Sequence, residues 1–213
     1  YPAQELTGVP VKAAASELAG RQAHKEYAFT SRPAFLESQG MTAAEKGTAL
    51  HTFIQFADYA KASENLTQEL HRLVEKKFLT EEQAKAVDEK QAAGFFNSGL
   101  MKRMLRSPNL LREYRFTIWI PASDIQPEIP DAQAQEPVLL QGAIDCAFEE
   151  DEGWVLVDYK TDRVKTADEL AARYATQLDL YAKALARCTG KPVRQRLLYS
   201  FVLGEAIALE GGL

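Results

Sequence analysis

The feature that most constrains the fold is a short apolar segment near the middle of the chain, Gly153–Lys160, which reads GWVLVDYK. Alternate side chains of a strand point to opposite faces, so its tryptophan and leucine line one face and its two valines the other. A strand that is apolar on both faces is a central one, covered on both sides. The segment therefore predicts an α/β domain built around one central sheet.

Helical patterns fill the first half of the chain, and strand patterns fill much of the second. Thr42, followed three residues later by Glu45, forms a capping box before an apolar stripe of helical spacing. The other expected helices are 65–78, one beginning at Thr80 and interrupted at Gly94, 96–105, and 168–186. The expected strands are 113–120, 138–150, 153–160 and 194–203. This order predicts a central mixed sheet flanked by helices, with an N-terminal helical region.

A short polar turn joins the second and third expected strands into an antiparallel hairpin. Taking the turn as residues 150–153, with a positive φ at its glycine, sets Glu149 opposite Trp154. In that register Asp145 lies directly opposite Asp158, with their Cβ atoms about 5 Å apart. Two carboxylates at that distance repel, and a divalent cation between them would remove the repulsion. A shift of one residue would put the two acids on opposite faces.

Each aspartate has a simpler interpretation, because acids on the solvent face of a strand are common. The apolar residues on both faces around Asp158 favour partial burial instead, and a buried carboxylate needs partners. Lys160 shares the face of Asp158 by the two-residue period. It could orient a metal-held water or stabilise charge that develops on a phosphate. The alternative for Lys160 is a plain salt bridge to Asp158.

Composition limits the classes of partner. The net charge of −5 provides no overall basic field, so any contact with nucleic acid must be local. The candidates for such contacts, each equally interpretable as ordinary solvated surface, are Lys102, Arg103, Arg106, Arg163 and Lys165. No apolar run is long enough to span a bilayer, so no membrane partner is expected.

Cofactor motifs are also few. The two cysteines, Cys146 and Cys188, match no zinc spacing and are too few for an iron–sulfur cluster of the usual kind, so none is expected. They fit a reducing, cytoplasmic setting. The sequence has no Gly-x-x-x-x-Gly-Lys-Ser/Thr stretch, so this chain is not expected to bind a nucleotide.

Several stretches together resemble the RecB-type branch of the PD-(D/E)XK nuclease superfamily. Asp145, followed on the next strand by Asp-Tyr-Lys at 158–160, resembles the signature of that superfamily. GTALHTFIQ at 47–55 is similar to its Gly-x-x-x-His motif, and YATQLDLY at 174–181 to its Gln-x-x-x-Tyr motif. QGAIDCAFEEDEGWVLVDYKTD, FLTEEQA and LREYRF resemble the AddA helicase–nuclease subunits of bacterial recombination complexes. The resemblance extends over about residues 40–203.

The resemblance implies a restriction-endonuclease-like core over residues 41–213, with residues 1–40 as a peripheral N-terminal segment. It also implies a role for each residue that matches a motif. The implied metal ligands are His51, Asp145, Asp158 and the backbone carbonyl of Tyr159. The implied catalytic residues are Asp145, Asp158 and Lys160. The implied supporting or DNA-placing residues are Gly47, Glu113, Gln177 and Tyr181.

The function implied is Mg²⁺-dependent hydrolysis of single-stranded DNA, with Mn²⁺ or Ca²⁺ able to occupy the same site. The chain would be part of a longer helicase–nuclease of the bacterial cytoplasm that processes double-strand breaks for recombinational repair. It would work with a helicase motor in the same polypeptide and with an AddB-type partner subunit. The alternatives are a non-catalytic DNA-binding or scaffold module of such a complex and, less favoured, a free-standing nuclease.

Overall fold

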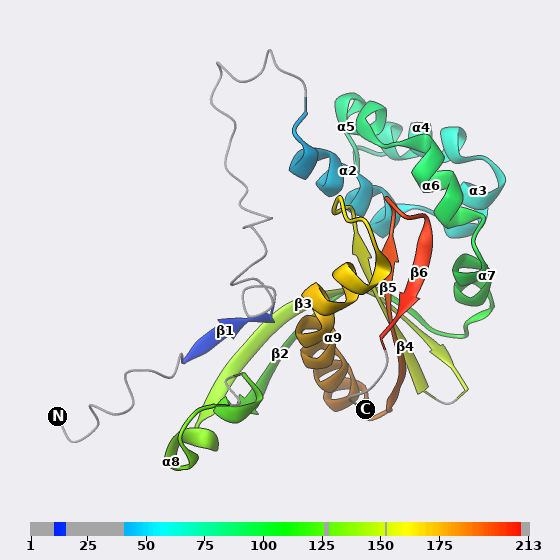
Figure 1. Cartoon of the computed structure of the whole chain (residues 1–213). Helices are drawn as coiled ribbons and strands as arrows, with labels where there is room; N and C mark the ends of the chain where they lie inside the picture. The colour runs from blue at the N-terminus through cyan, green and yellow to red at the C-terminus, as the bar shows by residue number, and fades with distance from the viewer. Residues whose placement is uncertain (1–10, 16–40, 126–127, 152, 210–213) are drawn as a thin grey trace.

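The computed structural model describes residues 11–15, 41–125, 128–151 and 153–209, and its centre is a mixed sheet between two layers of helices (Figure 1). The strands are β1 (Lys12–Ala14), β2 (Leu110–Pro121), β3 (Pro137–Glu150), β4 (Gly153–Lys160), β5 (Val193–Ser200) and β6 (Glu205–Ala208). Their order is β1-β3-β4-β5-β6, and β2 also pairs with β3. Strand β4 is central, as its two apolar faces predict, and it runs antiparallel to β3 and parallel to β5.

Two hydrophobic cores lie on opposite faces of the sheet. One contains Val155, Val157 and residues of the helical region that precedes β2; the other contains Trp154, Leu156 and much of the long helix α9. The helices of the first layer are α2 (Ala43–Phe56), α3 (Tyr59–Glu64), α4 (Leu66–Glu75), α5 (Glu81–Ala86), α6 (Glu89–Phe96) and α7 (Gly99–Arg106). The others are α9 (Ala167–Thr189) and, at the far end of β2 and β3, the short η3 (Ala122–Asp124) and α8 (Asp131–Ala134). Among the described residues, no helix is long and apolar enough to cross a membrane.

The predicted helix starts at Thr42 and Thr80 are confirmed. Each threonine accepts a hydrogen bond from the backbone three residues on and receives the reciprocal bond of a capping box. The expected interruption at Gly94 is wrong, because α6 continues through that residue. The chain breaks instead at Ser98, whose hydroxyl accepts from the Met101 N–H at 3.1 Å and starts α7.

Two strands were not predicted. Residues 12–14 form β1, which pairs in parallel with β3 at the edge of the sheet, and β6 pairs antiparallel with β5. Both are too short to show a periodic pattern, and their existence depends on the neighbouring strand. The rest of the peripheral segment expected over residues 1–40 lies outside the described residues.

The predicted hairpin register is confirmed, since Glu149 pairs with Trp154 and the ladder runs to Cys146 and Val157. The reason given for the glycine is wrong. The positive φ, 48°, belongs to Asp151. A Cβ at Gly153 would lie 2.4 Å from the Arg194 Cγ, so glycine is needed there for close contact with β5.

The regular pairing of β2 with β3 is interrupted at one position, between the pairs Arg112–Cys146 and Tyr114–Ile144; we call this interruption the break. Glu113 and Asp145 lie between those pairs and belong to neither ladder position. Glu113 has a φ of 50°, a left-handed conformation that costs an L-residue with a side chain about 1–2 kcal/mol. In β2, the odd-numbered residue before the break, Leu111, faces the core shared with α9. After the break, the even-numbered residues of the strand face that core. At the break, the side chains of Glu113 and Asp145 therefore do not follow the regular alternation between the two faces of the sheet.

Candidate active site

Three ionisable side chains from different elements converge beside the end of β4. His51 comes from α2, Glu113 from β2 and Asp145 from β3, and one ligand atom of each lies within 4.8 Å of the others. All three residues are half-buried. The sequence predicts His51 and Asp145 as metal ligands but leaves Glu113 in a supporting role, because neighbours along one strand do not reveal a left-handed residue at the break.

The carboxylate of Asp145 is held by the backbone of β4. Its Oδ2 accepts a hydrogen bond from the Tyr159 N–H at 2.8 Å, and the same oxygen lies 3.8 Å from the His51 Nδ1. The β3–β4 ladder ends one pair earlier, so Asp145 and Asp158 are not a ladder pair despite the correct register. The charge of Asp145 nevertheless acts on Asp158 and raises its pKa.

Asp158 and Lys160 form a buried ion pair. Asp158 is 2% exposed, and its Oδ2 lies 2.8 Å from the Lys160 Nζ. Burial raises the pKa of Asp158 to about 6; the Lys160 charge opposes this shift, and the Asp145 charge adds to it. Burial alone would lower the pKa of Lys160, but the neighbouring Asp158, Tyr174 and Asp145 outweigh it and raise that pKa. The lysine therefore keeps its proton at neutral pH.

Helix α9 completes the surroundings of Lys160. Its ammonium lies 3.8 Å from the centre of the Tyr174 ring, a cation–π contact, and donates to the Gln177 Oε1 at 3.4 Å. The Gln177 amide in turn donates to the Tyr181 hydroxyl at 2.9 Å. Gln177 and Tyr181 thus reach the site that the sequence assigns them. Tyr174, to which the resemblance assigns no role, also touches Lys160.

The ionised form of Glu113 is electrostatically unfavourable in this site. Burial and the Asp145 carboxylate raise its pKa, while His51 and Arg115 act in the opposite direction. A carboxylate held in a left-handed backbone beside another carboxylate is unfavourable without a compensating positive charge.

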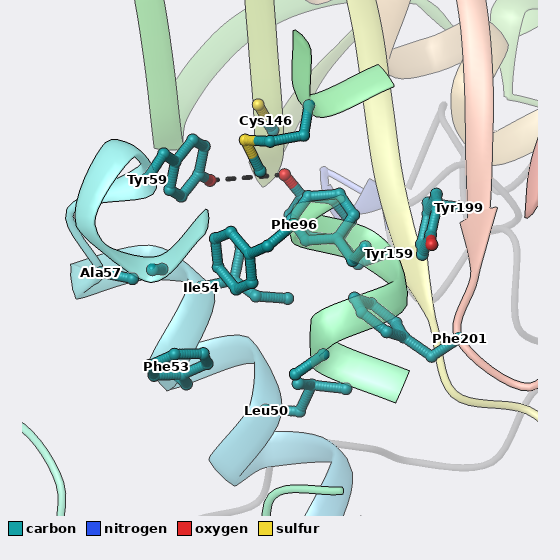
Figure 2. Packing of buried hydrophobic residues seen from close by; sticks show 14 of the residues in the cluster. Leu50, Phe53, Ile54, Ala57, Tyr59, Phe96, Cys146, Tyr159, Tyr199 and Phe201 are labelled. Atoms are coloured by element: carbon teal, nitrogen blue, oxygen red, sulfur yellow. Dashed lines mark hydrogen bonds between the residues drawn. The ribbon is translucent and has the colours of Figure 1, made fainter. Parts of the chain in front are cut away.

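The side chain of Tyr159 points away from the site. It is 3% exposed in the core beneath α2 to α7, where its hydroxyl lies 3.5 Å from that of Tyr59 (Figure 2). Arg112 links the same region to β2: it stacks 4.8 Å from the centre of the Tyr59 ring and donates to the Ala57 carbonyl at 2.6 Å. These contacts fix the end of α2, and with it the helix that carries His51. The Tyr159 carbonyl stays a prediction as a metal ligand, and the N–H, for which the sequence predicts no role, is the backbone group that contacts Asp145.

The chain that follows β4 packs against the start of α2. A Cβ at Gly47 would lie 2.9 Å from the Thr161 Oγ1, which accounts for the glycine one turn before His51. Asp162 accepts hydrogen bonds from Arg173 at 3.0 Å and from the Tyr174 hydroxyl at 2.9 Å. Thr166 is the cap of α9. Asp162 therefore ties this loop to the helix that faces Lys160.

The donor set suits a divalent cation. One imidazole and two carboxylates are ligands that Mg²⁺ and Mn²⁺ accept, with Mn²⁺ the better match for nitrogen. The mutual repulsion of Glu113 and Asp145 is what a cation would relieve. The structure thus contains a group of two acids and one histidine that could hold a divalent cation.

Residues 19–208 match the model of the PD-(D/E)XK nuclease superfamily. The chain belongs to that superfamily. Members of this superfamily use divalent metal ions, in keeping with the site of His51, Glu113 and Asp145. The predicted fold class is confirmed, with a mixed sheet flanked by helices.

This PD-(D/E)XK chain is similar to several curated proteins that share one name, the AddA subunit of an ATP-dependent helicase/nuclease. It is 42% identical over 82% of its length to that of Thermoanaerobacter sp. (strain X514). It is 37% identical over 98% of its length to that of Bacillus velezensis, and 40% identical over 84% to that of Clostridium botulinum (strain Loch Maree / Type A3). The matches span 15%, 19% and 14% of those relatives. The resemblance to AddA is confirmed.

Proposed function

We propose that this chain is a metal-dependent deoxyribonuclease that hydrolyses phosphodiester bonds of single-stranded DNA. The observation that carries the proposal is the convergence of His51, Glu113 and Asp145 beside the buried Asp158–Lys160 pair. Separated along the sequence, these groups meet at the end of one central strand. The proposal assigns the nuclease domain to residues 41–213.

His51, Asp145, Asp158 and the Tyr159 carbonyl would hold Mg²⁺, with Glu113 as an added candidate ligand from the opposite strand. The bound cation would polarise the scissile phosphate and lower the pKa of a water molecule. The Tyr159 N–H fixes one oxygen of Asp145, which leaves the other available to a ligand.

Lys160 would act as a fixed cation. Its raised pKa keeps the ammonium protonated, so it serves as a hydrogen-bond donor to the attacking water or to the phosphate oxygens, where charge develops. Tyr174 and Gln177 restrict its position, which reduces the reorganisation needed when a phosphate arrives. This role requires no proton transfer from Lys160.

The test pairs cleavage with metal binding. With a labelled single-stranded oligonucleotide and Mg²⁺, Lys160→Met should lose about 10²–10³-fold in rate while its Mn²⁺ affinity by calorimetry stays near wild type. Asp145→Asn should lose both cleavage and Mn²⁺ binding, and the exposed Asp131→Asn should lose neither. Wild-type chain that binds no Mn²⁺ and cleaves no DNA would favour the non-catalytic scaffold instead.

We also propose that this chain is part of a longer protein. Because the chain covers less than a fifth of its named relatives, we place it within a helicase–nuclease that has a motor in the same polypeptide. We further assign it an AddB-type partner, a role in double-strand-break processing for recombinational repair, and a bacterial cytoplasmic location. Copurification of a partner with the full-length protein, and loss of break processing with Asp145→Asn, would test these assignments.

A further inference from the structure

Beyond the break at Glu113 and Asp145, β2 and β3 continue as an arm that projects from the body of the molecule (Figure 1). One face of this arm is closed: Phe116, Ile120 and Leu140 belong to the core shared with α9. The alternate side chains of β2 lie on the other face and are exposed, and Trp119 reaches 54%. An indole so accessible on a regular strand is unusual, since tryptophan is normally largely buried.

Strand β3 contributes the partner residues of this face. Arg115 pairs with Ala143, Thr117 with Gln141, and Trp119 with Leu139. The Gln141 Nε2 donates to the Thr117 Oγ1 at 3.2 Å, so these two side chains lie on the same face. We call these six residues the open arm face. Lys12 of β1, also exposed, pairs with Leu139 at its margin.

The open arm face begins at the candidate metal site. Arg115 follows Glu113 by two residues on β2 and is close enough for its charge to act on that carboxylate. Trp119 follows Glu113 by six positions, which corresponds to about 20 Å of extended strand. The face thus offers a guanidinium next to the site, a pair of hydrogen-bonding side chains in the middle, and an indole at the far end.

The charge of this face identifies its partner. None of its six residues is acidic, and Arg115 and the neighbouring Lys12 are basic, although the whole chain has a net charge of −5. A basic group combined with an exposed aromatic ring is the combination by which proteins hold single-stranded nucleic acid, with phosphates on the cation and a base stacked on the ring. A protein partner would more often cover a contiguous apolar patch, and here a single large apolar side chain is exposed.

We propose that the open arm face is the track that holds the substrate strand next to the scissile phosphate, with Arg115 on a backbone phosphate and Trp119 stacked on a base. The inference rests on the proposed function and specifies where the single strand lies. It assigns the arm a role in DNA binding that is separate from the chemistry at the metal site.

Binding is measured first, without cleavage, using (dT)12 in EDTA. Affinity is taken from the fluorescence anisotropy of end-labelled (dT)12, which can be measured for variants that lack Trp119. In the wild type, whose second tryptophan, Trp154, is 5% exposed, quenching of tryptophan fluorescence by (dT)12 also reports on Trp119. Trp119→Ala should weaken binding by about ten-fold or more, while Trp119→Phe, which keeps a ring, should stay within a few-fold of wild type. Arg115→Ala should reduce the slope of log affinity against log salt by about 0.7, the value for one phosphate contact on a single strand.

Matched controls lie away from the arm. Arg194→Ala removes an exposed arginine from β5, and Phe78→Ala removes a 43% exposed aromatic ring from the α4–α5 connection. Neither should change affinity for (dT)12. Urea unfolding of each variant excludes loss of folded protein as the cause.

A second substrate separates the two proposals. Thymidine 5′-p-nitrophenyl phosphate is too short to reach Trp119, so with Mn²⁺ Trp119→Ala should hydrolyse it at the wild-type rate while losing kcat/KM on the oligonucleotide. Wild-type chain that hydrolyses neither this ester nor the oligonucleotide would refute the proposed function and leave the binding result to stand. Unchanged (dT)12 affinity in Trp119→Ala and Arg115→Ala, or a change only in self-association, would overturn the proposed track.

Discussion

Replacing Asp158 by asparagine should change stability by an amount that depends on pH. The carboxyl has an ordinary pKa of 3.8, and in the folded protein burial first, and then Asp145, raise it to about 6 against the opposing charge of Lys160. A carboxyl with a higher pKa when folded binds its proton more tightly in that state. Folding is therefore weakened as pH rises between those two values.

The size of the effect follows from the shift. A change from 3.8 to about 6 corresponds to about 3 kcal/mol of unfolding free energy lost between pH 4 and pH 7. Asparagine resembles the protonated carboxyl and does not titrate. The charge of Lys160 is already included in the raised pKa of Asp158, and the lysine stays protonated throughout this range, so it adds no further pH dependence. The difference between variant and wild type should thus move by about 3 kcal/mol in favour of Asp158→Asn.

The assay is urea unfolding of both proteins in EDTA from pH 4 to pH 8, with the difference in unfolding free energy plotted against pH. The exposed Asp151→Asn controls for removal of one carboxyl from the unfolded chain. A flat difference, a slope of opposite sign, or the same slope for Asp151→Asn would refute the argument that Asp158 is ionised at a cost in a buried site.

Three further outcomes are expected. Gly142→Ala places a Cβ 2.7 Å from the Phe116 Cζ and should lower the unfolding free energy by about 1–3 kcal/mol in urea titrations; an unchanged value would mean that the strand shifts freely. Tyr59→Phe removes the hydroxyl 3.5 Å from that of Tyr159 and should cost about 0.5–1.5 kcal/mol by the same measurement, with no loss contradicting a real hydrogen bond. Saturating Mn²⁺ should raise the melting temperature of the wild type and leave that of Asp145→Asn unchanged, whereas equal shifts would place the metal elsewhere.

Much of the fold could be predicted because its signals are local. The two apolar faces of β4 identify a central strand whatever surrounds it, and the capping boxes at Thr42 and Thr80 depend on residues three apart. The register that aligns β3 with β4 follows from the length of one short turn. These features are decided within a few residues of chain, where sequence pattern and structure correspond directly.

The elements that were missed depend on partners distant in sequence. Strands β1 and β6 exist because a neighbour offers an unpaired edge, and Gly153 is needed because Arg194 approaches it from β5. Asp162 has its partners on α9, where neither the spacing nor the local composition points to them.

The candidate site divides in the same way. The sequence by itself determined which residues are candidates for the site, including His51, Asp145 and the Asp158–Lys160 pair, because their motifs and their shared strand face are local properties. Only the tertiary structure decided that Glu113 joins them and that Asp145 is held by the Tyr159 N–H. The physical reason is the interruption of the pairing between β2 and β3. It combines a left-handed residue in one strand, Glu113, with an acid outside the ladder in the other, Asp145. The sequence of either strand alone does not reveal this combination.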